Sequence, residues 1–266
     1  MEIQHMKNKF FFCIFFLLNF TFLRADYYEG IELFSNYNSI DLNWLPQFLP
    51  YNPVILEAGA FRGHDTVKTA QIWPQSRIIA FEPDPYAFNE LQKNVNEAQV
   101  ANVELYNIAL NSYNGFALFN VCLGPNTNEP AYGYASSLLP LKKGMEIYCK
   151  GPQIQVTCVN LDSWCRENQI EAIDLLRLEV EGAEYNILKS SPNTLKNVKV
   201  IYIKTFIHPY RLGMTNYPAL KGFLEKNNFV LLSHRYQPDI IGHAIFLSRE
   251  LFDAYFKLSL GIYLDK

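Results

Sequence analysis

The chain has 266 residues, of which 49% are hydrophobic and 15% aromatic, enough for one packed domain and too apolar for a disordered protein. The formal net charge is −3 and the Lys and Arg residues are scattered, so the sequence does not predict nucleic acid as a partner.

The first 25 residues have a composition of their own. Lys7 and Lys9 precede an apolar run over 10–18 and a second over 20–23, and Ala25 stands where polar sequence begins. A basic start, a short apolar run and a small final residue are typical of a secretory signal peptide. The run is short for a membrane-spanning helix, which needs about 20 residues, so an uncleaved signal anchor is the alternative. We expect an exported or membrane-anchored protein, cytoplasmic only if this leader is not used, with membrane contact through this segment alone.

Residues 26–53 are expected to form a helical or irregular lead-in. Pro46, Pro50 and Pro53 exclude one long helix, because proline inside a helix removes a backbone hydrogen bond. The apolar anchors expected here are Trp44, Leu45, Phe48 and Leu49.

From residue 54 onward, strand-like apolar runs alternate with segments of helical spacing. Strands are predicted over 54–56, 77–81, 103–106, 154–159, 175–180, 200–204, 229–233 and 244–247. Helices are predicted over 65–73, 86–97, 162–168, 183–188 and 217–226. This alternation predicts an α/β fold in three layers, a mostly parallel sheet with helices on both faces.

One domain over 54–250 accounts for these elements. A stretch over about 111–153, rich in Asn, Gly, Pro and Tyr, interrupts the alternation and is predicted to be an inserted hairpin with a mobile loop around 126–137. Residues 251–266 are expected to form a C-terminal tail.

Beyond Cys13 in the leader, the cysteines are Cys122, Cys149, Cys158 and Cys165. Their spacing matches no zinc pattern, so no metal site is predicted. Export would allow two disulfides, for which three pairings are open. The preferred interpretation is that all four are small buried hydrophobic side chains.

The first motif that indicates a ligand is the turn from Glu57 to Gly63, directly after an apolar strand. Ligands of open α/β sheets bind at such turns, and Gly59 and Gly63 would let the backbone approach one closely. The spacing is not the GxGxxG of a dinucleotide site, which argues against a nicotinamide-dependent oxidoreductase. An acidic residue leading into the turn suits a ligand with a cationic group.

Two further acidic motifs follow strands. Glu82 ends the second strand, where a carboxylate can accept hydrogen bonds from both hydroxyls of a ribose. Glu179, Glu181 and Glu184 crowd the end of the strand over 175–180, and such a cluster favours a cationic or proton-transferring site. Glu184 is interpreted as a residue that favours a helix N-terminus.

Together these motifs resemble the FkbM-type methyltransferases. The resemblance runs from about Val54 to Leu247 and rests on the ordered motifs LEAGA (56–60), AFEP (80–83), NIAL (107–110) and LEVEGAE (178–184). It implies a class I methyltransferase (Rossmann-like) fold with S-adenosylmethionine as the cofactor. By this likeness the methionine part would lie against Glu57, Gly59, Ala60 and Gly63, the ribose on Glu82, and the adenine near Asn107 and Ala109.

The sequence departs from the family pattern at two sites. Glu179 stands where the family usually has Asp, in its Lys-Ile-Asp-Val-Glu-Gly motif, and Lys204 stands where relatives more often carry an acidic residue. The second change reverses a charge on the acceptor side, which leaves open whether catalysis is retained or the acceptor differs.

The resemblance implies methyl transfer, often to a hydroxyl of a sugar or small natural product, and a hydroxyl acceptor gains from a general base. The candidates are Glu181, Glu179 and His208. His64 could cap the helix after the turn, and His234 and His243 are interpreted as structural. The expected partner is a small-molecule or glycan acceptor. The alternative is an exported binding protein that kept the fold and lost the reaction.

Overall fold

The computed structural model of the chain describes residues 42–123, 135–145, 149, 151–236 and 241–260, without the side chains of 42–44, 236 and 257–260. The predicted signal sequence, much of the lead-in and most of the predicted loop around 126–137 lie outside these residues. None of the helices in the described ranges is long and apolar enough to cross a membrane.

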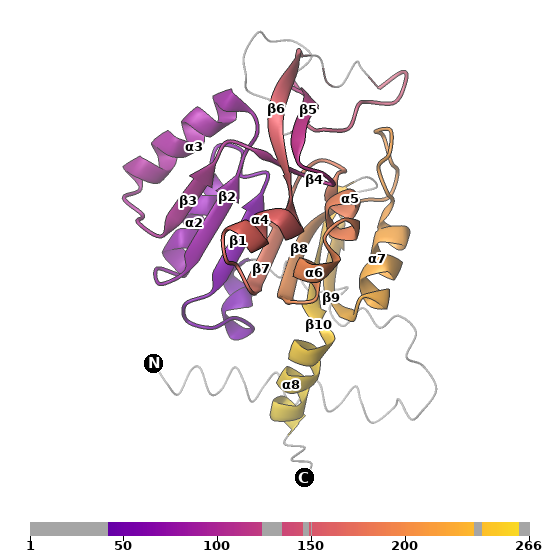
Figure 1. The fold of residues 1–266 in the computed structure, drawn as a ribbon. Coiled ribbons are helices and arrows are strands. Elements are labelled where there is room, and N and C mark those ends of the chain that lie inside the picture. The colour runs from indigo at the N-terminus through magenta and orange to yellow at the C-terminus, as the bar shows by residue number, and fades with distance from the viewer. Residues whose placement is uncertain (1–41, 124–134, 146–148, 150, 237–240, 261–266) are drawn as a thin grey trace.

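Seven strands form the main sheet, in the order β3-β2-β1-β7-β8-β10-β9 (Figure 1). They are β1 (Val54–Ala58), β2 (Arg77–Phe81), β3 (Val103–Tyr106), β7 (Ile173–Leu178), β8 (Val198–Phe206), β9 (Phe229–Tyr236) and β10 (Ile241–Ser248). The first five strands in this order, from β3 to β8, run parallel to one another. Strand β10 is antiparallel to both β8 and β9. The chain continues from β1 to β2 on one side and later places β7 on the other, and ligands of open α/β sheets bind at such a switch point.

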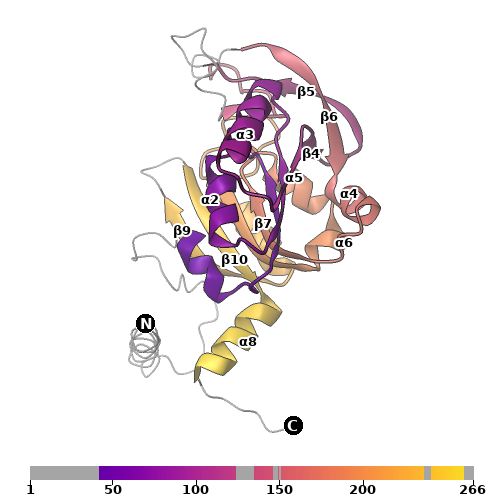
Figure 2. The same cartoon turned by 90° about the vertical axis from the view of Figure 1, so that its left-hand side faces the viewer.

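Helices cover both faces of this sheet (Figures 1 and 2). One face packs against α4 (Leu161–Glu167), α5 (Glu184–Lys189), α6 (Pro192–Leu195) and α7 (Tyr217–Lys226). The other packs against the 3-10 helix η1 (Leu42–Gln47), α2 (His64–Ile72), α3 (Pro85–Glu97) and α8 (Arg249–Leu260). The predicted three-layer α/β fold is confirmed.

Strand alternation decides which side chains reach which layer. Leu56 and Leu176 belong to the core beneath α4 to α7, whereas Ile55 and Leu175 belong to the core on the α2 side. Glu57 and Arg177 follow Leu56 and Leu176 in their strands, so they share the α2 side. This places a carboxylate and a guanidinium next to each other on two paired strands.

Short polar residues cap the starts of α3, α4 and α7, whereas α2 and α5 begin without a side-chain cap. Asp84 precedes α3 and accepts a hydrogen bond from the Tyr86 N–H at 2.9 Å, with Pro85 in the first turn. Asn160 and Asn216 cap α4 and α7 in the same way. Each cap satisfies an N–H that has no partner within the helix, which fixes the point where strand turns into helix.

A second, three-stranded sheet lies beyond the main one. It consists of β4 (Ala109–Asn111), β6 (Gln153–Asn160) and β5 (Gly115–Asn120), in that order. The predicted strand over 154–159 therefore exists but pairs with β4 and β5, outside the main sheet. Figure 1 shows β5 and β6 rising together above the main sheet, so the second sheet lies beyond the ends at which β1, β2 and β7 finish.

The C-terminal segment, expected as a tail, contains α8. Its Leu251, Phe252 and Tyr255 pack against the core that also holds Phe48, whose ring centroid lies 4.7 Å from that of Tyr255. The predicted anchors Leu45, Phe48 and Leu49 are buried, while the side chain of Trp44 lies outside the described residues.

Candidate cofactor site

The turn after β1 depends on its glycines because other parts of the protein pass close to it. The N–H groups of Gly59 and Ala60 both donate to the carbonyl oxygen of Phe81, at 3.0 and 3.1 Å. Gly59 has φ +85°, and a Cβ there would lie 2.1 Å from the carbonyl oxygen of Glu179. Gly63 has φ +80°, and its Cβ would lie 2.3 Å from a terminal methyl of Leu91. The turn is thus pressed against the ends of β2 and β7.

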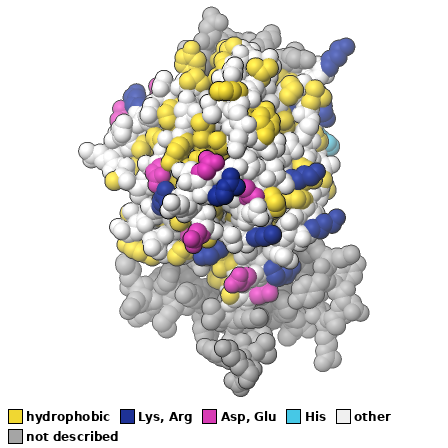
Figure 3. All heavy atoms as spheres, in the orientation of Figure 1, with side chains coloured by type: hydrophobic (Ala, Val, Ile, Leu, Met, Phe, Trp, Pro, Cys, Tyr) yellow, Lys and Arg dark blue, Asp and Glu magenta, His cyan; other side chains and the backbone are white. Residues whose placement is uncertain are grey.

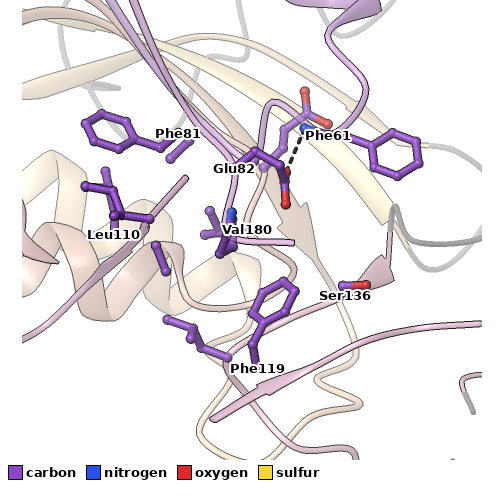
Figure 4. Close-up of a pocket in the computed structure, with 14 residues that line it drawn as sticks. Phe61, Phe81, Glu82, Leu110, Phe119, Ser136 and Val180 are labelled. Atoms are coloured by element: carbon purple, nitrogen blue, oxygen red, sulfur yellow. Dashed lines mark hydrogen bonds between the residues drawn. The ribbon is translucent and has the colours of Figure 1, made fainter. Parts of the chain in front are cut away.

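A pocket that is partly open to solvent lies beside this turn (Figure 4). The main sheet contributes the ends of β1, β2 and β7, and the second sheet and its flanking segment cover them. The lining residues are Ala58, Gly59, Phe61, Phe81, Glu82, Pro83, Ile108, Ala109, Leu110, Phe119, Ser136, Leu138, Glu179 and Val180.

Glu82 lies in this pocket as a fixed carboxylate. One oxygen accepts the N–H of Phe61 at 2.7 Å and the other that of Asp84 at 2.9 Å, and Figure 4 shows the bond to Phe61. A carboxylate offers about four acceptor positions, so two remain for a ligand with neighbouring hydroxyls. Burial raises the pKa of Glu82 to about 7, although the two backbone donors act in the opposite direction.

The segment predicted to lie near the adenine also reaches the pocket, through Ile108 and Ala109 and not through Asn107. Ala109 is buried and lines the pocket with Ile108. The exposed Asn107 donates from Nδ2 to the carbonyl oxygens of Glu82 and Pro83, at 2.8 and 3.2 Å. Asn107 therefore ties the segment after β3 to the end of β2.

Glu57 does not line the pocket. It is buried on the α2 side, where one oxygen accepts the Thr66 hydroxyl at 2.6 Å and the other accepts the Arg177 guanidinium at 2.7 Å. Burial raises the pKa of Glu57, and Arg177 opposes that rise. Glu57 therefore stabilises the turn through its contacts with Thr66 and Arg177 on the α2 side of the sheet.

Glu179 does line the pocket and is held by Arg177 and His243. One oxygen is bonded to Arg177, and the other lies 3.4 Å from Nε2 of His243. Burial alone would raise the pKa of Glu179, but Arg177, with His243 and Lys204, lowers it well below its ordinary range. Glu179 is therefore ionised throughout the neutral range, which makes it a weak base and a lasting negative charge.

Glu181 lies outside the pocket lining. Its side chain is buried and its φ is +56°, a backbone conformation that few residues other than glycine adopt. One oxygen is paired with Lys204, and the other accepts the Tyr210 hydroxyl at 2.6 Å. Burial would lower the pKa of Lys204, but Glu181 raises it, so Lys204 stays charged. The unusual Lys204 thus neutralises a buried carboxylate.

Glu184 and His208, which the sequence also singled out, lie outside the pocket lining. Glu184 begins α5, the position expected for it, and accepts the N–H groups of Val180 and Gly182 in the turn before the helix, at 3.0 and 2.9 Å. Burial raises its pKa to about 8. His208 is exposed, and within the described residues no hydrogen bond or ion pair joins it to the carboxylates of the site. His64 begins α2 without a side-chain cap.

Sequence reasoning missed the residues that organise the site. Arg177 contacts Glu57, Asp65 and Glu179 from inside β7, and His243, interpreted as structural, reaches Glu179 from β10. The signal for Arg177 was a cation that follows two leucines and precedes a third within a buried strand. No local pattern marked His243.

The segment over 135–139, which covers the pocket beside the second sheet, is joined to the rest of the fold by buried contacts. Arg211 is fully buried and donates to the carbonyl oxygens of Leu139, at 2.7 Å, and Ala135. A disulfide joins Cys122 to Cys149, whereas Cys158 and Cys165 are free and buried. The preferred interpretation of the cysteines was thus wrong for the first pair and right for the second.

The switch-point pocket, the carboxylate at the end of β2 and the glycine turn after β1 are arranged as in a class I methyltransferase fold. Residues 57–231 match the methyltransferase FkbM domain. The chain belongs to this family.

Curated relatives carry methyltransferase names. The chain is 30% identical over 155 residues to the 2-O-methyltransferase NoeI of Sinorhizobium fredii, a match that covers 57% of this chain and 62% of that protein. It is 30% identical over 159 residues to the methyltransferase sdnD of Sordaria araneosa, covering 53% and 61%. The chain thus spans about 60% of the length of these relatives.

Solved structures resemble the fold at lower identity. An rRNA methylase from Streptococcus thermophilus has a TM-score of 0.45 and 13% identity, covering 79% of this chain and 99% of that one. The N-terminal domain of EvdMO1 with SAH bound has a TM-score of 0.45 and 14% identity, covering 79% and 82%.

Proposed function

We propose that this protein is an O-methyltransferase that uses S-adenosylmethionine to methylate a hydroxyl of a sugar or small natural product. The observation that carries the proposal is the pocket containing Glu82, whose two unused acceptor positions suit the two hydroxyls of the cofactor's ribose. The name of one relative, a 2-O-methyltransferase, supports oxygen as the atom methylated.

The charge of the pocket supports this cofactor over a dinucleotide. Its described lining contains two carboxylates, Glu82 and Glu179, and no Lys, Arg or His. A ligand with phosphates would find no basic side chain among these lining residues. On the face drawn in Figure 3, basic side chains lie among acidic ones, which supports a small acceptor over nucleic acid.

When bound, S-adenosylmethionine would supply a methyl group on a positively charged sulfur. The acceptor oxygen would take that methyl group, the neutral thioether would leave, and the hydroxyl proton would pass to a base. Rate enhancement in such a transfer comes largely from alignment of the two reactants. Of the three predicted bases, Glu179 alone lines the pocket. Its low pKa favours an electrostatic role, and Glu181 and His208 remain predictions without a contact in the pocket.

The test is transfer of tritium from labelled S-adenosylmethionine to a panel of monosaccharides, oligosaccharides and hydroxylated natural products. We expect label on one hydroxyl class, and the product to be identified by mass spectrometry. Cofactor binding without transfer to any acceptor would favour the second candidate.

The second candidate is an exported binding protein that has lost the reaction. The Cys122–Cys149 disulfide favours it, since disulfides persist mainly in oxidising compartments, and so does the predicted leader. S-adenosylmethionine is made in the cytosol, so an exported enzyme would need a supply. A reporter fused after Lys266 tests export, and a thiol titration of the purified chain tests the disulfide.

A further inference from the structure

The inner wall of the cofactor pocket carries one carboxylate whose charge is fixed by its surroundings. Glu179 is bonded to Arg177 and lies 3.4 Å from His243, and its side chain is 21% exposed, so it faces the pocket from a largely buried position. Three other carboxylates near the pocket differ: Glu82 is held by backbone N–H groups, and Glu57 and Glu181 lie outside the lining.

The cation that holds Glu179 does not neutralise the neighbourhood. Arg177 is shared between Glu57, Asp65 and Glu179, which gives three carboxylates to one guanidinium. Lys204 is paired with Glu181. Arg177 is therefore shared among three carboxylates and offsets only part of the charge of Glu179, the member of that group that lines the pocket.

The methyl donor and its product differ in charge. S-adenosylmethionine has a sulfonium and one net positive charge, whereas S-adenosylhomocysteine has a neutral thioether and no net charge. A fixed carboxylate in a partly buried wall attracts the first more than the second, because the attraction is weakly screened there.

We propose that Glu179 is a specificity-determining residue, positioned by Arg177 and His243, which makes the pocket prefer the cationic methyl donor over the neutral product. This inference rests on the proposed function and extends it: the same charge that favours donor binding favours release of the product once the sulfonium has lost its methyl group. The Arg177 contact keeps the Glu179 side chain from turning away.

The test measures the affinities of the full chain for S-adenosylmethionine, S-adenosylhomocysteine and sinefungin by isothermal titration calorimetry. Sinefungin carries an ammonium group in place of the methylsulfonium and cannot donate a methyl group. Glu179→Gln removes the charge at nearly constant size, and Glu179→Asp keeps it. Glu167→Gln on α4, whose side chain is 66% exposed, is the control for loss of one surface charge.

The wild-type protein and Glu167→Gln are expected to bind both cationic ligands more tightly than S-adenosylhomocysteine. Glu179→Gln is expected to lower that preference about tenfold, with little change in affinity for the neutral product, and Glu179→Asp to retain most of it. The melting temperature of each variant shows whether it is folded.

The outcomes separate the two proposals. If the wild-type protein binds none of the three ligands, the proposed function fails and this inference fails with it. If it binds all three but prefers the neutral product, or if folded Glu179→Gln loses affinity for all three equally, the proposed function stands and the role of Glu179 as a charge selector is overturned.

Discussion

The guanidinium of Arg177 on β7 donates to the carboxylate of Glu57 on β1 at 2.7 Å, and the strand register places the two residues opposite each other. The same guanidinium bonds Asp65 of α2 at 2.5 Å and Glu179 at the end of β7. One buried cation thus joins the cofactor turn, the helix after it and the pocket wall.

Replacing Arg177 should therefore cost much more stability than a surface charge would. Arg177→Met leaves Glu57 buried without its cation, and breaking a buried pair in this way costs about 3–5 kcal/mol. Arg177→Lys keeps the charge but loses the forked geometry, so a smaller loss is expected. Urea denaturation gives both values. A loss below about 1 kcal/mol for Arg177→Met would show that the cluster contributes little.

The two glycines of the turn should respond differently to alanine. Both have positive φ, which costs a non-glycine residue about 1–2 kcal/mol. At Gly59 the new methyl meets the backbone carbonyl of Glu179, whereas at Gly63 it meets the flexible end of Leu91. We expect Gly59→Ala to abolish S-adenosylhomocysteine binding and Gly63→Ala to weaken it only partly, as measured by calorimetry. Equal effects would contradict the close approach at Gly59.

The raised pKa of Glu82 predicts a pH dependence of stability. Burial raises this pKa from 4.5 to about 7, so the folded state binds the proton more tightly than the unfolded state. The contribution is fully present below about pH 4.5 and is lost as the pH rises through about 7. It amounts to on the order of 3 kcal/mol, at about 1.4 kcal/mol per pKa unit. The free energy of unfolding of the unliganded wild type should fall over this range relative to Glu82→Gln, and parallel curves would contradict the shift.

The Lys204–Glu181 pair should behave as a coupled unit. Lys204→Met leaves the buried Glu181 with the Tyr210 hydroxyl, and a loss of about 3–5 kcal/mol is expected. Adding Glu181→Gln removes the unpaired charge and should restore part of that loss. A double-mutant cycle in urea measures the coupling. Additive losses would mean that Lys204 and Glu181 act independently, and Lys204 would then be free to face the acceptor.

The fold could be predicted because its elements repeat a strong local pattern. Alternating strands and helices fix a parallel sheet with two covered faces, and the turn over 57–63 and Glu82 follow their strands as that architecture requires. The pairing of β6 could not be predicted in this way, since its alternating exposed and buried residues suit any half-covered sheet. The helix α8 was missed although Leu251, Phe252 and Tyr255 have helical spacing.

The site was predicted less completely because its contacts join distant parts of the chain. Arg177 meets Glu57 across 120 positions and Asp65 across 112, and no sequence pattern reports such a separation. His243 reaches Glu179 only because β10 runs antiparallel beside β8. Carboxylates were recognised by their place after strands, but which of them lines the pocket depended on these partners.

The most direct test of the account is a crystal structure of the chain with S-adenosylhomocysteine. We expect the ligand in the pocket between the turn after β1 and strands β4 and β5. Its ribose hydroxyls should lie on the Glu82 carboxylate and its adenine beside Ile108 and Ala109. A ligand bound elsewhere, or a ribose that makes no contact with Glu82, would contradict it.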